Sequence, residues 1–304
     1  MIVYCLVMKM KKQLRGSAYL LLATIFWGST FVAQDAAMNY IQPFTFQAVR
    51  TLLGALCLVP VIWMMDRKAG KSFLQEWKDP KLWKAGILCG IPLFLAGNLQ
   101  QMGIGEGTDP GKAGFLTTMY ILFVPLIGIF RKEKAPRLLP ISLVLAVAGL
   151  YFLSFSGVAQ ISLGDLLLLS CALMYAVQII VVDQYVDQVD PVRLNAIQIL
   201  VASIMTWILM LTIDKPTVGA IAACWLPILY SGILSSAVAF TLQIVGQKDL
   251  PPSLASLIMS LESVFAVLTG LVFGKLMGSQ EIIGCGLMFA AVILCQLPIP
   301  AKKK

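Results

Sequence analysis

The sequence predicts an all-α integral membrane protein of ten transmembrane helices, arranged as two inverted repeats of five helices. Three observations lead to this fold class. Hydrophobic residues make up 59% of the 304 residues and charged residues only 12%, whereas soluble domains carry roughly 25% charged residues. The apolar residues form runs long enough to cross a bilayer, whose hydrocarbon core is about 30 Å thick. The two halves of the chain also share residues at a regular spacing, which is 148 residues at first and 142 after the long basic loop.

Apolar runs bounded by charged, proline or glycine residues define the ten helices. Backbone polar groups must be satisfied within lipid, and the alternating pattern of a barrel strand is missing, so these runs predict helices. The expected spans of the first half are 17–35, 44–64, 83–103, 112–130 and 138–155, and those of the second half are 164–182, 192–212, 223–246, 253–273 and 281–298. We therefore expect a cytoplasmic N-terminal segment at 1–16, a first repeat at 17–155 and a second repeat at 164–298.

The positive charges assign the ends of these spans to the two sides of the membrane. With the amino terminus placed in the cytoplasm, nineteen of the 23 Lys and Arg residues fall on the cytoplasmic side and three, Lys112, Lys215 and Lys275, on the other. Because cytoplasmic loops carry the excess of Lys and Arg, we expect a multi-pass protein of the inner or plasma membrane with both termini cytoplasmic. The net charge of +8 is then a matter of topology and does not indicate a nucleic-acid partner.

An internal repeat relates the two halves. An offset of 148 residues pairs Gly16 with Gly164, Asp35 with Asp183, Pro43 with Pro191 and Ala48 with Ala196, and after the long basic loop an offset of 142 pairs Trp83 with Trp225, Gly90 with Gly232, Gln101 with Gln243, Pro110 with Pro252 and Gly128 with Gly270. Since five spans is an odd number, the second half must cross the membrane in the opposite direction. Inverted repeats are typical of secondary transporters, whose substrate site lies near the midplane between the halves.

Short motifs in several spans carry a family resemblance. They are Trp27–Val32, Arg50, the run from Gly111 through Thr117 to Tyr120, Val124–Pro125, Gly164–Asp165 and Leu261–Glu262. With these residues the chain resembles the EamA-type, ten-helix members of the drug/metabolite transporter superfamily. The resemblance implies export or exchange of amino acids or other small metabolites and leaves the substrate open. Two positions depart from the family pattern, because Ser263 stands where proline is usual and Lys275 where glutamate is usual.

Two ionisable residues lie well inside the expected spans, where a charge costs about 2.5–3.5 kcal/mol. Glu262, near the middle of the ninth span, is a candidate for proton coupling or for binding a cationic group of the substrate. Alternatively, it is a protonated residue that holds its helix to a neighbour. Arg50 lies nearer the outer end of the second span and its repeat partner Gln198 is uncharged, so we expect it to reach toward the membrane surface in a structural role.

The repeat also predicts which polar residues face the central axis. Trp27 and Thr30 share a helix face, and their repeat partners are another aromatic and polar pair. The predicted substrate-binding set is Trp27, Thr30, Asn98, Gln101, Tyr120, Tyr175, Gln178, Gln243 and Glu262. Such a pocket suits a small zwitterion or an aromatic solute. The alternative is that the aromatic residues only fill space and that the amides pair between helices.

A stripe of small residues follows one face of the ninth span, at Ser256, Ser260, Ser263, Gly270 and Gly274. Small residues let another helix approach closely. The stripe therefore predicts a static contact within the chain, a sliding seam between the halves, or the contact of a homodimer.

Other function classes find little support in the sequence. It has no histidine, and its seven cysteines lack C-x-x-C spacing, so no metal or cofactor is expected. The glycine-rich run Gly103–Gly107 lacks the Gly-Lys-Ser/Thr of a phosphate loop. A membrane-embedded enzyme acting on lipids needs clustered acids, histidines or a nucleophile with a base, none of which is evident, and a scaffold without transport activity is the other alternative. The expected partners are a small-molecule substrate and the lipid bilayer.

Overall fold

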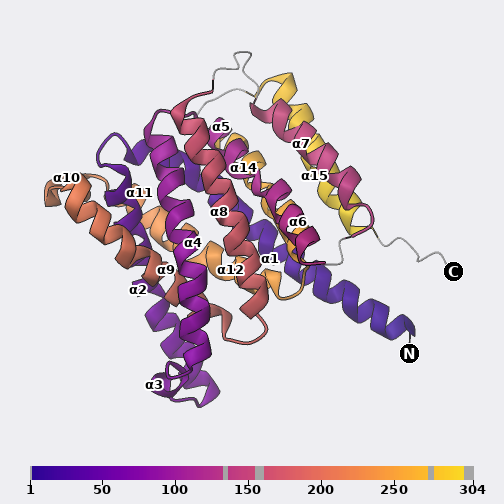
Figure 1. Ribbon diagram of the computed structural model, residues 1–304, viewed down its shortest axis with the longest axis horizontal. Helices are drawn as coiled ribbons and strands as arrows, with labels where there is room; N and C mark the ends of the chain where they lie inside the picture. The colour runs from indigo at the N-terminus through magenta and orange to yellow at the C-terminus, as the bar shows by residue number, and fades with distance from the viewer. Residues whose placement is uncertain (1, 133–135, 155–160, 273–276, 298–304) are drawn as a thin grey trace.

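The computed structural model describes residues 2–132, 136–154, 161–272 and 277–297, and all the regular secondary structure in these ranges is helical. The elements are α1 (Ile2–Ala37), α2 (Pro43–Ala69), α3 (Phe73–Glu76), α4 (Pro80–Gly105), α5 (Pro110–Thr117), α6 (Tyr120–Phe130), α7 (Leu139–Ser154), α8 (Leu163–Tyr185), α9 (Pro191–Leu209), the π-helix η1 (Met210–Asp214), α10 (Val218–Ala223), α11 (Trp225–Tyr230), the π-helix η2 (Ser231–Ala239), α12 (Phe240–Gln247), α13 (Pro252–Met259), α14 (Glu262–Val272) and α15 (Ser279–Gln296). Figure 1 shows them as one helical bundle.

The predicted class, an all-α membrane protein with many spans, is confirmed. Within the described ranges nine helical segments are long and apolar enough to cross a membrane, and the apolar helix α7 is a shorter tenth. One boundary differs clearly from the prediction, because α1 begins at Ile2 and runs through the segment expected to precede the first span. This segment is rich in Lys, Met and Leu, which are good helix formers, and contains no proline. In Figure 1, the N-terminal part of α1 projects beyond the other helices.

Local sequence signals explain where most spans begin. Five of the helices, α2, α4, α5, α9 and α13, start at a proline, namely Pro43, Pro80, Pro110, Pro191 and Pro252. Proline suits this position because its backbone angle is already helical and its missing N–H would have no partner there. At the start of α8, Ser162 and Asp165 form a reciprocal capping box that satisfies two otherwise free backbone donors.

The fourth and ninth spans are each broken into two helices near their middle. The breaks fall at Thr118–Met119 and at Ser260–Leu261. The bounds of α13 and α14 lie 142 residues after those of α5 and α6, which is the offset of the sequence repeat. At the second break, Ser260 and Ser263 donate their hydroxyl groups to backbone oxygens three residues earlier. Such bonds compete with the helical hydrogen bonds and bend helices.

Each half packs mainly against helices of the other half. The first helix of the first half, α1, contacts η2, α12 and α14, whereas the first helix of the second half, α8, contacts α4, α5 and α6. Two further pairs bring equivalent helices together, α2 with α9 and α7 with α15. The pair α7 and α15 lies side by side at one edge of the bundle (Figure 1). This exchange of partners is consistent with two related halves around a shared axis.

The small-residue stripe of the ninth span is buried inside the chain. Ser256, Ser260 and Ser263 are at most 1% exposed, and Gly270 is buried as well, while Gly274 lies outside the described residues. Of the three expectations for the stripe, contact within the chain agrees with this burial. In the described part of the chain, the stripe leaves no open face for a second copy.

Candidate functional site

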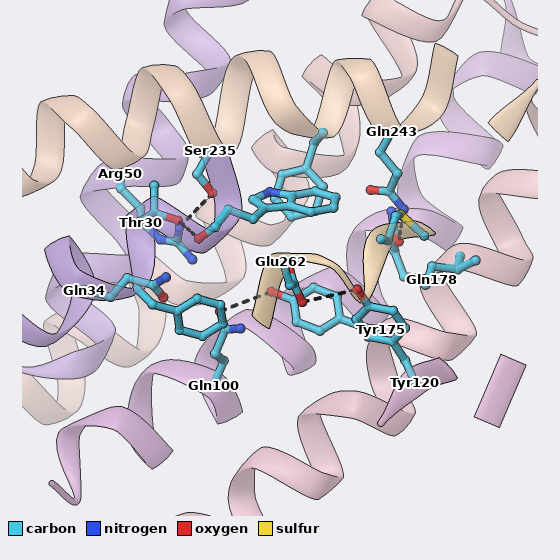
Figure 2. A pocket seen from close by; sticks show the side chains of 15 residues that line it. Thr30, Gln34, Arg50, Gln100, Tyr120, Tyr175, Gln178, Ser235, Gln243 and Glu262 are labelled. Atoms are coloured by element: carbon cyan, nitrogen blue, oxygen red, sulfur yellow. Dashed lines mark hydrogen bonds between the residues drawn. The ribbon is translucent and has the colours of Figure 1, made fainter. Parts of the chain in front are cut away.

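A cavity lies between the two halves of the bundle, lined by side chains of both. Its walls come from α1, α2, α4 and α6 of the first half and from α8, η2, α12, α13 and α14 of the second. The lining residues are Trp27, Thr30, Phe31, Gln34, Arg50, Gln100, Tyr120, Tyr175, Gln178, Ile179, Ser235, Phe240, Gln243, Met259 and Glu262. Figure 2 shows these side chains converging on the cavity from different helices.

Glu262 and Tyr120 meet at the centre of this site. Each is the first residue of the second helix of a broken span, and they are equivalent in the repeat. The Tyr120 Oη donates a hydrogen bond of 3.2 Å to Glu262 Oε1 (Figure 2). Glu262 is 5% exposed, and the ion pairs found among the described residues involve other carboxylates. A buried carboxyl group without a basic partner can accept a proton or bind a cationic group.

Arg50 also faces the cavity, and the prediction that it reaches toward the membrane surface is wrong. Its side chain lies between α2 and η2 and is 3% exposed. The Nε atom donates to Gln47 Oε1 at 2.7 Å, and Nη1 lies 3.4 Å from Ser235 Oγ. The guanidinium carbon is 5.5 Å from the centre of the Phe46 ring. Tertiary packing holds Arg50 inside, because η2 covers the face of α2 from which it projects.

Aromatic residues form further walls of the cavity. The rings of Trp27 and Phe240 meet edge to face, with centroids 5.1 Å apart and an interplanar angle of 63°. The Tyr175 Oη lies 3.4 Å from Gln100 Oε1. The packing therefore combines apolar ring surfaces with a few polar atoms, as is usual in ligand pockets.

The cavity contains most of the predicted site residues, but not Asn98 or Gln101. Asn98 donates to Thr206 Oγ1 at 2.8 Å and so joins α4 to α9. Gln101 lies 3.3 Å from the backbone oxygen of Gln34 and is fully buried. Both residues therefore make contacts between helices, outside the cavity lining.

Sequence reasoning missed several lining residues for a definable reason. Gln100 has a leucine, Leu242, as its repeat partner, so a search for polar residues in both halves passes over it. Phe31 and Ile179 are repeat partners and both line the cavity. A search that included paired apolar residues would have found them.

A buried amide network leads from the cavity toward one end of the bundle. Lys248 follows Gln247 there and Arg15 pairs with Asp249, while Asp66, beside Arg67, pairs with Arg193. We call this the basic end. Gln243 Nε2 donates to Gln178 Oε1 at 3.0 Å and to Gln247 Oε1 at 2.9 Å. Gln178 Nε2 in turn donates to Gln198 Oε1 at 3.1 Å. These four side chains are at most 2% exposed, so the network closes the cavity on that side.

Comparisons with known proteins agree with this architecture. The sequence profile of the EamA-like transporter family matches the chain twice, over residues 14–155 and 162–296. An uncharacterized transporter of Archaeoglobus fulgidus is 29% identical over 95% of this chain and 88% of its own length. The uncharacterized transporter YwfM of Bacillus subtilis is 24% identical over 95% of both chains. A crystal structure superposes with a TM-score of 0.74 over 92% of this chain and 95% of its own, at 18% identity, which shows a shared fold.

Proposed function

Because the chain belongs to the EamA-like transporter family, we propose that it is a secondary-active transporter that exports small metabolites, such as amino acids, by alternating access. In this proposal the protein lies in the inner or plasma membrane with both termini in the cytoplasm. The basic end of the bundle then faces the cytoplasm, in keeping with the excess of positive residues in cytoplasmic loops.

The observation that carries the proposal is the shared cavity between the two halves. Both halves contribute polar and aromatic side chains to it, so a rocking motion of one half against the other changes its access. Its position at two broken helices is typical of transporters, in which irregular backbone lines the substrate site.

Closure at the basic end suggests that the structure resembles the step of the cycle in which the cavity is shut off from the cytoplasm. The network of Gln178, Gln198, Gln243 and Gln247 separates the cavity from that end. To admit a solute from the cytoplasm, α8 and α12 must move apart and break the Gln178–Gln243 bond. Amides suit such a contact because hydrogen bonds between membrane helices contribute only about 0.6 kcal/mol each on average.

Glu262 is the proposed site of proton coupling. It lies at the break between α13 and α14 and shares a hydrogen bond with Tyr120 of the other half. Protonation or deprotonation of Glu262 changes this contact between the halves. A proton can therefore bias the equilibrium between the two access states through its different affinity for each.

Flux measurements in proteoliposomes test the proposed function. The purified protein is reconstituted into liposomes, and these are loaded with radiolabelled amino acids and other small metabolites. Efflux is compared with that from protein-free liposomes. We expect saturable, solute-specific flux for a subset of the panel. Correctly inserted, folded protein that moves none of these solutes would contradict the proposal.

A further inference from the structure

Arg50 is a buried cation that lacks an acidic partner among the described residues. Within the described ranges, its hydrogen bonds go to the neutral side chains Gln47 and Ser235. The other buried arginine, Arg193, is 3% exposed and forms an ion pair with Asp66. A charge buried away from water is costly unless it is paired, so Arg50 has a reason to bind an anion that Arg193 does not have.

The repeat shows that the framework around Arg50 does not require a positive charge. Gln47 and Arg50 correspond to Asn195 and Gln198 at the offset of 148. The same hydrogen bond is present in both halves, from Arg50 Nε to Gln47 Oε1 and from Gln198 Nε2 to Asn195 Oδ1. Arg50 lines the cavity, whereas Gln198 is buried in the amide network beyond it. The positive charge therefore occurs in the first half, where this repeat position lines the cavity, and not in the second half, where it does not.

The surroundings of Arg50 are suited to a ligand group. Guanidinium carries five donors in a fixed fork, which matches the two oxygens of a carboxylate. In the part of the chain that the structure describes, partners are found for its Nε and Nη1 atoms and not for Nη2. Gln34 lines the same side of the cavity (Figure 2), and its Oε1 atom is buried without a hydrogen-bond partner in the described part of the chain. As an acceptor, this oxygen suits a donor group of the ligand, such as an amine, and leaves the carboxylate to Arg50.

The balance of charge in the cavity limits the ligand class. Arg50 is the one cation and Glu262 the one carboxylate among the described lining residues. A phosphate dianion would meet a single positive group and a carboxyl group. A solute with one carboxylate, with or without an amine, fits this arrangement better.

On these grounds, and resting on the proposed transport function, we infer that Arg50 binds the carboxylate of the transported solute. The site therefore selects small carboxylates, including zwitterionic amino acids, over amines of the same shape. Arg50 is then the residue that determines specificity for the acid group, and Glu262 is left to meet a proton or an amine.

The first experiment measures ligand-induced thermal stabilisation with matched sets of three probes that share one side chain. One set consists of phenylalanine, 3-phenylpropanoate and phenethylamine, and corresponding sets are built on leucine, threonine and alanine. A ligand that binds the folded state raises the melting temperature. We expect stabilisation by the amino acid or the acid of at least one set and at least tenfold weaker binding of the amine. Equal binding of the amine, or binding by no member of any set, would overturn the inference.

The second experiment compares three variants. Arg50→Gln reproduces the residue found at the equivalent position of the other half, so it is expected to fold with a melting temperature near that of the wild type. Its affinity for the carboxylate probe should fall at least tenfold, and Arg50→Lys should restore part of it, because lysine keeps the charge but not the fork. Arg67→Gln, on an exposed part of α2, is the matched control and should bind normally.

The two proposals fail in different ways. If Arg50→Gln binds and transports the carboxylate probe like the wild type, the inference about Arg50 is wrong but transport stands. If the wild type moves no solute in proteoliposomes, the transport function itself fails.

Discussion

At the scale of single residues, the central feature is the pair formed by Glu262 and Tyr120. These two positions are equivalent in the repeat, yet one is a carboxyl group and the other a phenol. Their contact places one acidic group near the axis that relates the halves. In the proposed cycle, this difference places a single carboxyl group at the contact between the halves.

Glu262→Gln tests the proton-coupling role. Glutamine can still accept the hydrogen bond from Tyr120, but it cannot gain or lose a proton near neutral pH. We expect transport driven by a pH gradient to fall at least tenfold, whereas exchange of solute without a gradient persists. Glu106→Gln, at an exposed position outside the cavity, should leave the pH dependence unchanged. An unaltered pH profile in Glu262→Gln would remove this residue from the coupling step.

The aromatic walls give a second residue-scale prediction. Trp27→Ala and Tyr175→Ala each remove ring surface from the cavity, and we expect a rise of at least tenfold in the solute concentration for half-maximal flux, with a smaller effect on thermal stability. Trp225→Ala, at a largely exposed tryptophan, is the control. Parallel losses of melting temperature and transport would indicate that Trp27 and Tyr175 only fill space.

At the scale of elements, the contact between α1 and α14 positions Glu262. Gly28 allows this contact, because a Cβ atom at Gly28 would lie 2.5 Å from Phe265 Cβ and 2.6 Å from the backbone oxygen of Glu262. Both are far below normal van der Waals distances. Close approach of α1 thus depends on the missing side chain at this position.

Gly28→Ala is expected to separate α1 from α14. Overpacking of this kind costs about 1–3 kcal/mol, so both the melting temperature in detergent and the transport rate should fall. Gly114→Ala is the matched control on α5, since its Cβ would lie 3.6 Å from Ala266 Cβ and from Ser263 Cα, an ordinary contact. Equal melting temperatures for the two variants would show that α1 can shift without cost.

At the scale of the whole molecule, α2 is joined at both ends to the continuous segment formed by α9 and η1, through equivalent contacts. At the basic end, Arg193 and Asp66 form a buried ion pair. At the other end, Asp214 accepts hydrogen bonds of 2.7 and 2.8 Å from the backbone N–H and the hydroxyl of Thr45. Asp66 corresponds to Asp214 and Thr45 to Arg193 at the offset of 148. The contacts thus follow the repeat, but only one of them is an ion pair.

This difference predicts unequal effects of two equivalent substitutions. Asp66→Asn breaks the buried ion pair and leaves Arg193 only the partly exposed Asp190, 3.5 Å away, as a charged partner. Breaking a buried pair by removing one partner costs about 3–5 kcal/mol. Asp214→Asn weakens bonds to neutral partners and should cost about 1.5–3 kcal/mol. Thermal unfolding in detergent measures both, and Asp66→Asn should have the lower melting temperature. The reverse order would mean that the ion pair is not the stronger of the two contacts.

The membrane class and the approximate spans follow from the amino-acid sequence alone, because long apolar runs have few other stable arrangements. It also supplied a repeat register that reappears in the bounds of both broken helices. From this register we predict that Tyr120 and Glu262 face the same cavity, and their role in binding stays a prediction. The breaks themselves were missed, since apolar periodicity continues across them.

Which side of each helix faces the cavity depends on how the helices pack together. Gln100 and Gln101 are neighbours in sequence, and successive residues of a helix point about 100° apart, yet Gln100 lines the cavity and Gln101 contacts α1. Arg50 likewise faces the cavity because of the way in which α2 packs against its neighbours. The rotation of a helix about its axis is set by the helices packed against it. When a helix is apolar nearly all around, its sequence has no distinct polar face from which that rotation can be predicted.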